Sequence, residues 1–562
     1  MRLIRTIVLT LAIAPAACAP RPQPAVPPGP APPVTIQILA INDLHGHLEP
    51  PPGSNGRINA VEAGGAEYLA THLRQAIARQ PNSIVVAAGD LVGASPLVSS
   101  AFHDEPVIEA LDAIGLSVTT VGNHEFDEGY EELLRLKRGG CHPRDGCQDG
   151  DAFDGARFDY LAANVVRKAD GRPLFPATAV RTVGGVKVGF IGVTTRETAQ
   201  IVPASVTRDL TFVNEADAAN AAAAGLKREG VDAIVLLIHE GLRQRAQGPA
   251  EPNGCATPGG ALEAVVSRLS GDIGVVISGH SHGFYNCRIG SRLVTSASSY
   301  GRMYTRITLT VAAPSGRIVT AEAANEIVTR DVPRDAAVAA VVAKYAKLVE
   351  RVAGEVVGAV TGDLKTEATA AGESALGNLI ADAQLAAASG AERGSAVVAF
   401  MNRGGVRAEI LAGPGAAAGS PAPVTYGALH SVQPFGNTVM TLTMTGDMIR
   451  RLLEQQFDNP VAGARQILQV SNGFTYRYRS TAAPGQRVEA QSIQVGGRRI
   501  APSDRVRVAA SDFLLNGGDG FSVFGEGTDR QAVIGDVEAL VEYFRARSPI
   551  ASPARDRIVR ID

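Results

Sequence analysis

The stretch Val121-Gly122-Asn123-His124-Glu125-Phe126-Asp127 follows an apolar run, Leu116 to Val121, that is typical of a buried strand. Gly122 lets the backbone turn, and an amide, an imidazole and a carboxylate then leave the strand end close together. Polar groups at the carboxyl end of a strand are placed to face a crevice rather than to fill a core. Taken alone, the stretch also fits a turn with capping residues, so its meaning depends on partners elsewhere in the chain.

Four other predicted strands end in residues of the same kind. In chain order they are Val34 to Ile41 before Asn42-Asp43-Leu44-His45-Gly46, Ser83 to Ala88 before Gly89-Asp90, Ala233 to Ile238 before His239, and Ile273 to Ile277 before Gly279-His280-Ser281-His282. Asp43 and His45 stand two residues apart on an extended exit, so both side chains can reach one ion. Chance explains one or two such endings but explains five poorly. We therefore predict that these strand ends form one site.

Apolar residues at helical spacing lie between these strands. They predict helices from Ala60 to Arg79, Glu105 to Ile114 and Glu215 to Arg228, and shorter apolar runs predict two more strands, from Ala179 to Arg181 and from Val186 to Val193. Arg138 to Phe158 interrupts the pattern, and we predict that it is a surface insertion.

Length and composition restrict the class of protein. The chain has 562 residues, of which 45% are hydrophobic and 19% charged, which predicts a soluble globular protein of two or more domains. A net charge of -3, without a long Lys/Arg run, argues against a nucleic-acid partner.

The motifs quoted above resemble the full series of the calcineurin-like metallophosphoesterases and, within that superfamily, the exported 5′-nucleotidase family. The resemblance extends from Val34 to about Thr329 and implies a β-sandwich flanked by helices, with two metal ions at one sheet edge. Asp43 and His45 would hold the first ion, Asp90 would bridge both, and His282 would return to the first. The second ion would be held by Asn123, His239 and His280. His124 would contact the phosphoryl group, and Asp127 would hold His124.

The chemistry of these residues agrees with that resemblance. Two ions about 3.5–4 Å apart clamp an in-line phosphoryl displacement and lower the pKa of water, so no Ser or Cys nucleophile is required. A protonated His124 would stabilise charge on the phosphoryl oxygens. Mixed nitrogen and oxygen ligands suit Zn or Mn, with Co as a further candidate, and the sequence does not choose between them.

The second half of the chain follows a predicted linker helix. Val332-Pro333-Arg334-Asp335 resembles a helix start, and Ala336 to Val352 continues with helical spacing. We therefore predict a first domain over residues 34–330, a linker helix over 331–355 and an α+β domain over 356–562. Gly-rich turns between short strands and helices mark this last domain.

Four motifs resemble the 5′-nucleotidase carboxy-terminal domain, which binds substrate in that family: Glu373-Ser374-Ala375-Leu376-Gly377-Asn378-Leu379, Asn402-Arg403-Gly404-Gly405-Val406-Arg407, Pro434-Phe435-Gly436-Asn437 and Phe513-Leu514-Leu515-Asn516-Gly517-Gly518-Asp519-Gly520-Phe521. The resemblance implies that Phe435 and Phe513 sandwich a nucleobase, although core packing is the simpler role of a phenylalanine. Asp519 would accept hydrogen bonds from ribose hydroxyls. Asn402 and Arg407 would contact phosphate.

This second domain departs from the family pattern at one place. Some members carry a further phosphate-binding Arg just before the Glu-Ser-Ala-Leu-Gly-Asn segment, and Thr366 to Gly372 contains none. Arg403, where the motif often has Gly, is a candidate substitute. Phosphate affinity and substrate range are therefore left open.

The first residues predict export. Arg2 and Arg5 precede an apolar run, Ile7 to Ala17, that is too short to span a membrane. A signal over residues 1–18 with a lipid on Cys18 is one interpretation, and ordinary cleavage near Ala17 or Ala19 is the other. A Pro-rich tether over 19–33 follows. Either route takes the protein to the periplasm or to a lipid anchor on the cell envelope.

Without Cys18 the chain has four cysteines, and an even number in an exported chain predicts two disulfides. Cys141 and Cys147 bracket a short turn and are the expected local pair, which leaves Cys255 and Cys287 for each other. A metal site that uses the first pair with His142 is the alternative, but the spacing matches no usual zinc pattern. The histidines outside the motifs are expected at the surface or in packing: His47, His72, His103, His142 and His430.

The sequence thus predicts an exported two-metal phosphohydrolase that acts on nucleoside 5′-monophosphates and other nucleotides. Closely related alternatives are a 2′,3′-cyclic nucleotide phosphodiesterase with 3′-nucleotidase activity and a nucleotide-sugar hydrolase. A nucleotide-binding surface protein without catalysis and a structural envelope lipoprotein are the other classes, and the complete ligand set argues against both. The sequence leaves the oligomeric state open.

Overall fold

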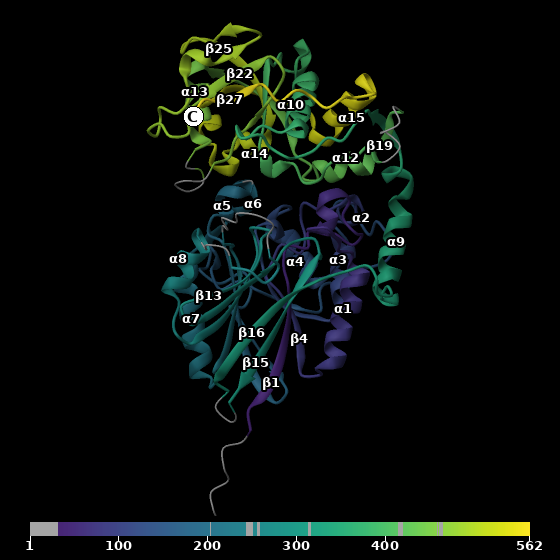
Figure 1. The fold of residues 1–562 in the computed structure, drawn as a ribbon, viewed down its shortest axis with the longest axis vertical. Coiled ribbons are helices and arrows are strands. Elements are labelled where there is room, and N and C mark those ends of the chain that lie inside the picture. The colour runs from purple at the N-terminus through teal and green to yellow at the C-terminus, as the bar shows by residue number, and fades with distance from the viewer. Residues whose placement is uncertain are drawn as a thin grey trace, which may run out of the picture.

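A computed structural model describes residues 32–202, 204–242, 251–255, 259–312, 316–413, 420–457, 459 and 465–562. The predicted signal, Cys18 and most of the tether lie outside the described residues. The chain forms two domains, one above the other in Figure 1, with helix α9 (Ala336–Ala353) along one side of the molecule. Among the described helices, none combines the length and the apolar character that crossing a membrane requires.

The N-terminal domain is a sandwich of two six-stranded sheets. The first has the order β16 (Ile318–Ile327), β15 (Met303–Val311), β1 (Val34–Ile41), β4 (Ser83–Ala87), β5 (Leu116–Thr120) and β6 (Asp159–Leu161). The second has the order β13 (Phe284–Ile289), β14 (Arg292–Ala297), β12 (Ile273–Ser278), β11 (Ala233–His239), β9 (Val186–Thr194) and β8 (Thr178–Val183).

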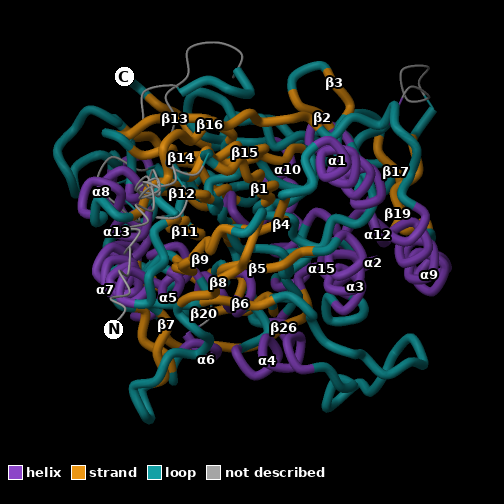
Figure 2. The backbone as a smooth tube through the Cα atoms, turned by 90° about the horizontal axis from the view of Figure 1, so that it is seen from below, coloured by secondary structure: helices purple, strands orange, loops and turns teal. Residues whose placement is uncertain are grey.

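Helices cover the outer face of each sheet. Helices α1 (Ala66–Arg79) and α3 (Glu105–Ile114) lie on one side of the sandwich, and α7 (Glu215–Arg228) and α8 (Ala261–Arg268) on the other (Figure 2). In β1, Ile36 and Ile38 pack between the sheets, whereas Leu39 and Ile41 pack under the helices. Strands buried on both faces need continuous apolar runs, which is the pattern that the sequence shows there.

The strand register brings the predicted site residues to one edge. Strands β1, β4 and β5 run parallel, and so do β9, β11 and β12. Parallel strands end at the same edge of a sheet, and the two sheets present this edge toward the C-terminal domain. The predicted helices over Glu105–Ile114 and Glu215–Arg228 are confirmed at both ends.

The helix expected from Ala60 begins at Ala66 instead. Gly64 and Gly65 have φ angles of 93° and 107°, which no helix contains. Strand β3 (Val61–Glu62) precedes them and pairs with β2 (Arg57–Ile58). The predicted start of the helix is therefore wrong, because the helical spacing of apolar residues extends into a β-hairpin.

Helix α9 belongs to the N-terminal domain by its packing. Asp335 caps it by accepting hydrogen bonds from the N–H groups of Ala337 and Val338. Its buried side chains join the core of the first sheet and its helices, and they include Val338 and Tyr345. The linker helix is thus predicted correctly as a helix, and it is anchored on one domain.

The C-terminal domain is built around a five-stranded sheet and a four-stranded sheet. The larger sheet has the order β21 (Gln469–Val470), β18 (Val398–Met401), β25 (Arg505–Ser511), β20 (Thr438–Thr445) and β26 (Thr528–Gly535). The smaller has the order β24 (Arg498–Arg499), β23 (Gln494–Val495), β22 (Phe474–Tyr478) and β27 (Ile558–Arg560). The main helices are α10 (Ala375–Ala388), α12 (Tyr426–Val432), α13 (Gly446–Gln455) and α15 (Asp536–Arg547).

The remaining short elements lie near the domain boundary or at the surface. They are α2 (Leu97–Ser100), α4 (Tyr130–Arg138), β7 (Val165–Arg167), α5 (Thr198–Ile201), α6 (Ala204–Thr207), β10 (Leu210–Phe212), β17 (Val356–Val360), β19 (Ala422–Thr425) and α14 (Asp512–Leu515). Helices α5 and α6 stand at the top of the N-terminal domain, directly below the other domain (Figure 1). Both predicted disulfides, Cys141–Cys147 and Cys255–Cys287, are formed.

Candidate active site

A cavity of about 450 Å³ lies between the two domains at the shared strand edge. The N-terminal domain contributes Asp90, Asn123, His124, Asp127, His280 and His282 to its lining, and the C-terminal domain contributes Asn402, Arg407, Phe435, Phe513 and Asp519. The other predicted site residues are fully buried beneath the cavity: Asp43, His45 and His239. Together with Asp90, Asn123, His280 and His282 they form its floor. The structure therefore brings together the residues that the sequence placed far apart.

One group of possible ligands contains Asp43, His45 and His282. Their ligand atoms all lie within 4.8 Å of one another. Nδ1 of His45 donates to the carbonyl of Gly93 at 2.9 Å, and Nε2 then lies 3.0 Å from Nε2 of His282. Nε2 of His282 is also 3.5 Å from Oδ1 of Asp43. Backbone carbonyls that orient a ring in this way are typical partners of metal-binding histidines.

A second group contains Asp90, His239 and His280, with Asn123 beside it. Nδ1 of His239 donates to the carbonyl of Ala88 at 2.8 Å. Nε2 of His239 approaches Oδ2 of Asp90 to 2.9 Å, yet it has no hydrogen-bond partner among the described residues. Nδ1 of His280 lies 3.0 Å from Oδ1 of Asn123. The close approach of Nε2 of His239 to Oδ2 of Asp90 without hydrogen-bond geometry suits a cation between them.

Five of the predicted metal ligands lie in the left-handed region of backbone conformation, which residues other than glycine rarely adopt. Asp43, His45, Asp90, His280 and His282 have φ angles of 49°, 49°, 50°, 68° and 54°. Left-handed residues other than glycine are uncommon and gather at functional sites. At Gly122, a Cβ atom would collide with the Asp90 carboxylate. This explains why the stretch that opens the site begins with glycine.

The electrostatics of the floor also fit a divalent cation. Burial raises the pKa of Asp43 to about 7, and the nearby Asp90 carboxylate adds to the rise against the opposing effect of His239. Burial and the charge of Arg407 lower the pKa of both His45 and His282. Neutral imidazoles and crowded carboxylates are the donor set that Zn, Mn or Co prefers. These residues could therefore hold divalent ions.

His124 stands beside this floor and is oriented by Asp127. Its Nδ1 donates to Oδ2 of Asp127 at 2.8 Å, which directs Nε2 away from that carboxylate. Its backbone N–H donates to Oδ1 of Asp90 at 2.9 Å. The ring of Phe435, from the other domain, stacks at 5.7 Å between centroids.

Glu125 has a positioning role that the sequence did not reveal. It is buried and accepts hydrogen bonds from the backbone N–H groups of Asp90, Leu91 and Gly122. It thereby joins the loops that follow two neighbouring strands. The residue type alone gave no signal for this, because a capping carboxylate and a ligand look the same in sequence.

The C-terminal domain reaches the floor through Arg407. Its Nη2 lies 3.4 Å from Nε2 of His45, and its buried Nε has no hydrogen-bond partner in the described part of the chain. Its guanidinium lies 5.7 Å from the centre of the Phe435 ring. Nδ2 of Asn402 donates to Oδ2 of Asp519 at 2.7 Å. A buried N–H without an acceptor indicates space for an anionic ligand.

Some residues of the quoted motifs lie away from the cavity. Arg403 is exposed and does not contribute to its lining. Glu373 is fully buried and accepts hydrogen bonds from Asn378 and from the backbone of Arg557 and Ile558, which is a structural role. The lining also contains residues outside the quoted motifs, namely Glu197, Ile201, Glu240 and Gln466.

Comparison with known proteins agrees with this geometry. Residues 36–284 match the calcineurin-like phosphoesterase family, and residues 356–526 match the 5′-nucleotidase C-terminal domain. The chain is 32% identical over 549 residues to a cell wall protein of Listeria monocytogenes, covering 91% of this chain and 67% of that protein. The chain belongs to the 5′-nucleotidase family.

Two further matches show how far the likeness extends. The endonuclease YhcR of Bacillus subtilis is 33% identical over 536 residues, and the match covers 93% of this chain but 41% of that protein. The crystal structure of a 5′-nucleotidase precursor from Thermus thermophilus superposes with a TM-score of 0.76 at 26% identity, over 94% of this chain and 100% of that one. The two-domain architecture is therefore shared with this Thermus protein over its whole length.

Proposed function

We propose that this chain is a two-metal phosphohydrolase that releases phosphate from nucleoside 5′-monophosphates. The observation that carries the proposal is the meeting of two domains in one cavity. Phe435 and Arg407 of the C-terminal domain lie beside His124 and His45 of the N-terminal domain. An aromatic face, a cation and a ligand-rich floor are the elements that a nucleotide monoester requires. The name of the Thermus relative supports the same substrate class.

The floor would hold the two ions as follows. Asp43, His45 and His282 would bind the first, Asn123, His239 and His280 the second, and Asp90 both. Divalent ions at these positions supply Lewis acidity and lower the pKa of water toward neutrality. The carbonyls of Gly93 and Ala88 keep His45 and His239 turned toward the ions.

Residues around the floor would then position the nucleotide. Nε2 of His124 faces away from Asp127 and would donate to a phosphoryl oxygen, stabilising the charge that develops there. Arg407 would pair with the phosphate through its unpartnered N–H. Phe435 and Phe513 would contact the base, and Asp519 would accept from the ribose hydroxyls. Asn402 holds Asp519 in place and would also contact the phosphate.

We further propose that the protein is exported. The two disulfides support this, because they persist in oxidising compartments. Lipid attachment at Cys18 is tested by labelling cells with a palmitate analogue. Label that disappears in Cys18→Ser supports the anchor, and unlabelled wild-type protein shows ordinary cleavage.

A substrate panel tests the proposed reaction. The metal-free protein is assayed with Mn²⁺, Zn²⁺ or Co²⁺ against AMP, ATP, 3′-AMP, 2′,3′-cyclic AMP, a nucleotide sugar and p-nitrophenyl phosphate, with a chelator control. We expect metal-dependent phosphate release that is fastest with AMP. Preference for the cyclic or 3′ substrates would keep the metal floor and reject the substrate assignment. Nucleotide binding without turnover under every metal would reject catalysis itself.

A further inference from the structure

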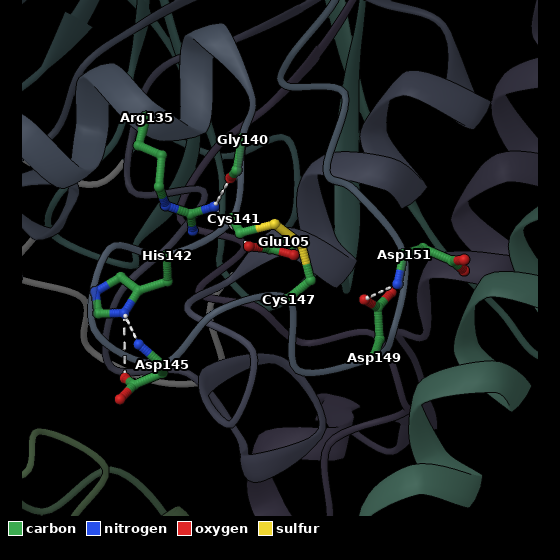
Figure 3. Close-up of a disulfide and its surroundings, with 9 residues drawn as sticks. All are labelled: Glu105, Arg135, Gly140, Cys141, His142, Asp145, Cys147, Asp149 and Asp151. Atoms are coloured by element: carbon green, nitrogen blue, oxygen red, sulfur yellow. Dashed lines mark hydrogen bonds and ion pairs between the residues drawn. A yellow bond between two sulfur atoms is a disulfide. The ribbon is translucent and has the colours of Figure 1, made fainter.

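A second group of histidines and carboxylates lies outside the cavity, at the disulfide-bonded insertion. Cys141 and Cys147 close a short loop that contains His142 and Asp145, and Figure 3 shows these two side chains directed toward one another. His103 reaches the same place from the turn before α3. From the sequence, His103 was expected at the surface or in packing, His142 was a metal ligand only in an alternative that used the two cysteines, and Asp145 had no role.

Asp145 is the centre of this group. Its Oδ2 lies 2.9 Å from Nε2 of His103 and 3.1 Å from Nδ1 of His142. The two imidazole rings stack with centroids 3.7 Å apart and an interplanar angle of 16°, so one ring must turn for both lone pairs to meet at one ion. One ligand atom from each residue falls within 4.8 Å of the other two.

Each ring is oriented by a second partner. Nδ1 of His103 donates to Oε2 of Glu128 at 2.8 Å, and hydrogen bonds to Glu128 and Asp145 raise the pKa of His103 to about 8, so an ion bound at Nε2 would displace the proton that faces Asp145. Nδ1 of His142 accepts a hydrogen bond from the backbone N–H of Asp145 at 3.2 Å, and an ion bound at this nitrogen would replace that bond. Glu128 thus orients a histidine as Gly93 and Ala88 do in the cavity. A lone pair that faces a carboxylate oxygen requires a proton or a cation between them.

The side chains around the group carry more negative charge than the neighbouring arginine neutralises, which favours binding of a cation. Glu132 is already neutralised by Arg135, which also pairs with Glu105. Glu128 and Asp145 lack such an arginine among the described contacts, and their side chains are 46% and 44% exposed. His142 is only 6% exposed. Its loop is closed by the disulfide and by a hydrogen bond from Gly146 to its carbonyl, so the backbone that carries His142 and Asp145 is held in place.

We infer that His103, His142 and Asp145 form a binding site for one transition-metal ion of the Zn²⁺ class. Two imidazoles and one carboxylate suit Zn²⁺ and disfavour Mg²⁺ and Ca²⁺, which prefer oxygen ligands. Glu128 is a positioning residue, and water completes the coordination. The disulfide sulfurs are not ligands and act as a clamp on the loop.

The ion would stabilise the contact between the insertion and the linker helix. Oδ2 of Asp149, two residues after Cys147, accepts from Nζ of Lys344 at 2.6 Å and from the hydroxyl of Tyr345 at 2.9 Å. Both partners belong to α9. The site therefore links the loop before α3, the insertion and the helix that joins the domains. It is independent of the proposed hydrolysis.

Zinc stoichiometry tests this inference. The full chain is stripped with a chelator, dialysed against buffered Zn²⁺ and analysed for bound metal. We expect His142→Gln and His103→Gln each to bind about one zinc ion fewer per chain than the wild type, with unchanged phosphate release. His72→Gln is the matched control, because His72 donates to Thr329 far from both clusters and should keep the wild-type count. Equal counts in the wild type and both cluster variants would overturn the site.

Crystallography locates the ion without any substitution. Wild-type crystals soaked in Zn²⁺ should show an anomalous peak between His103, His142 and Asp145 at the zinc edge. Crystals with zinc in the cavity but no peak at the insertion would also overturn the inference. This measurement remains decisive if either histidine variant fails to fold.

Discussion

The active-site floor and the insertion cluster, made of His103, His142 and Asp145 with Glu128 beside them, collect the same kinds of side chain in different surroundings. In the floor, Asp43, His45 and His239 are fully buried at the ends of parallel strands. In the insertion cluster, Asp145 of the insertion and Glu128 of the turn before α4 are nearly half exposed. Buried carboxylates need a counter-charge, whereas exposed ones are also stabilised by water. We therefore expect bound metal to be essential at the floor and dispensable for catalysis at the insertion.

The strongest way to break this comparison is to remove one carboxylate from each cluster. Asp90→Asn should lower kcat/KM for AMP by more than about 100-fold, since losing even an outer-shell partner of a metal costs 10–100-fold. Asp145→Asn should leave kcat/KM unchanged. Steady-state kinetics of both variants, with circular dichroism as a check on folding, decide the matter. Full activity in Asp90→Asn would contradict the two-metal floor.

Increasing concentrations of chelator should remove metal first from the insertion cluster and then from the floor. The insertion cluster offers three protein ligands, of which Asp145 is 44% exposed, so its zinc should leave at lower chelator concentration than the ions of the floor. We expect one zinc ion to be lost while phosphate release continues, and activity to be lost only in a later stage. Parallel loss of all zinc and all activity would show that the clusters do not differ in affinity.

Only the floor lies next to the aromatic rings of Phe435 and Phe513. Substituting one of these rings should therefore affect substrates that carry a nucleobase more than substrates that do not. Phe435→Ala should raise KM for AMP by about 5- to 150-fold, the range that corresponds to about 1–3 kcal/mol of lost stacking per base. The KM for p-nitrophenyl phosphate, which has no base, should change much less. Equal changes for both substrates would mean that Phe435 supports the fold rather than the nucleotide.

His430 belongs to neither cluster, so its substitution should change stability and not metal binding. We expect this effect to be the smallest of the four. It lies on α12 near Ser100 of the other domain, and burial lowers its pKa to about 4. Because folding disfavours its protonation, its contribution to stability is complete above about pH 6.5 and decreases as the pH falls toward 4, by at most about 3 kcal/mol. Urea unfolding between pH 4 and 7 should show a weaker pH dependence in His430→Gln. An equal pH dependence of the free energy of unfolding in both proteins would show that burial does not affect the protonation of His430.

The sequence alone determined the strands and their polar endings. Strands buried on both faces require unbroken apolar runs, so the places where Asp43, Asp90, Asn123, His239 and His280 follow such runs were visible without a structure. Parallel register then brings these endings to one edge. The disulfide between Cys141 and Cys147 was predictable for a similar reason, since their separation is local.

Tertiary structure decided the features that depend on distant partners. Helix α1 begins at Ala66 because a glycine pair and a hairpin override the apolar spacing before it. Glu125 became a backbone acceptor, and His103 met His142 and Asp145, only because loops from separate elements converge. Local patterns record which face of an element is buried. They do not record which other segment covers it, and that contact determines whether a polar side chain caps a turn, pairs with a charge or binds an ion.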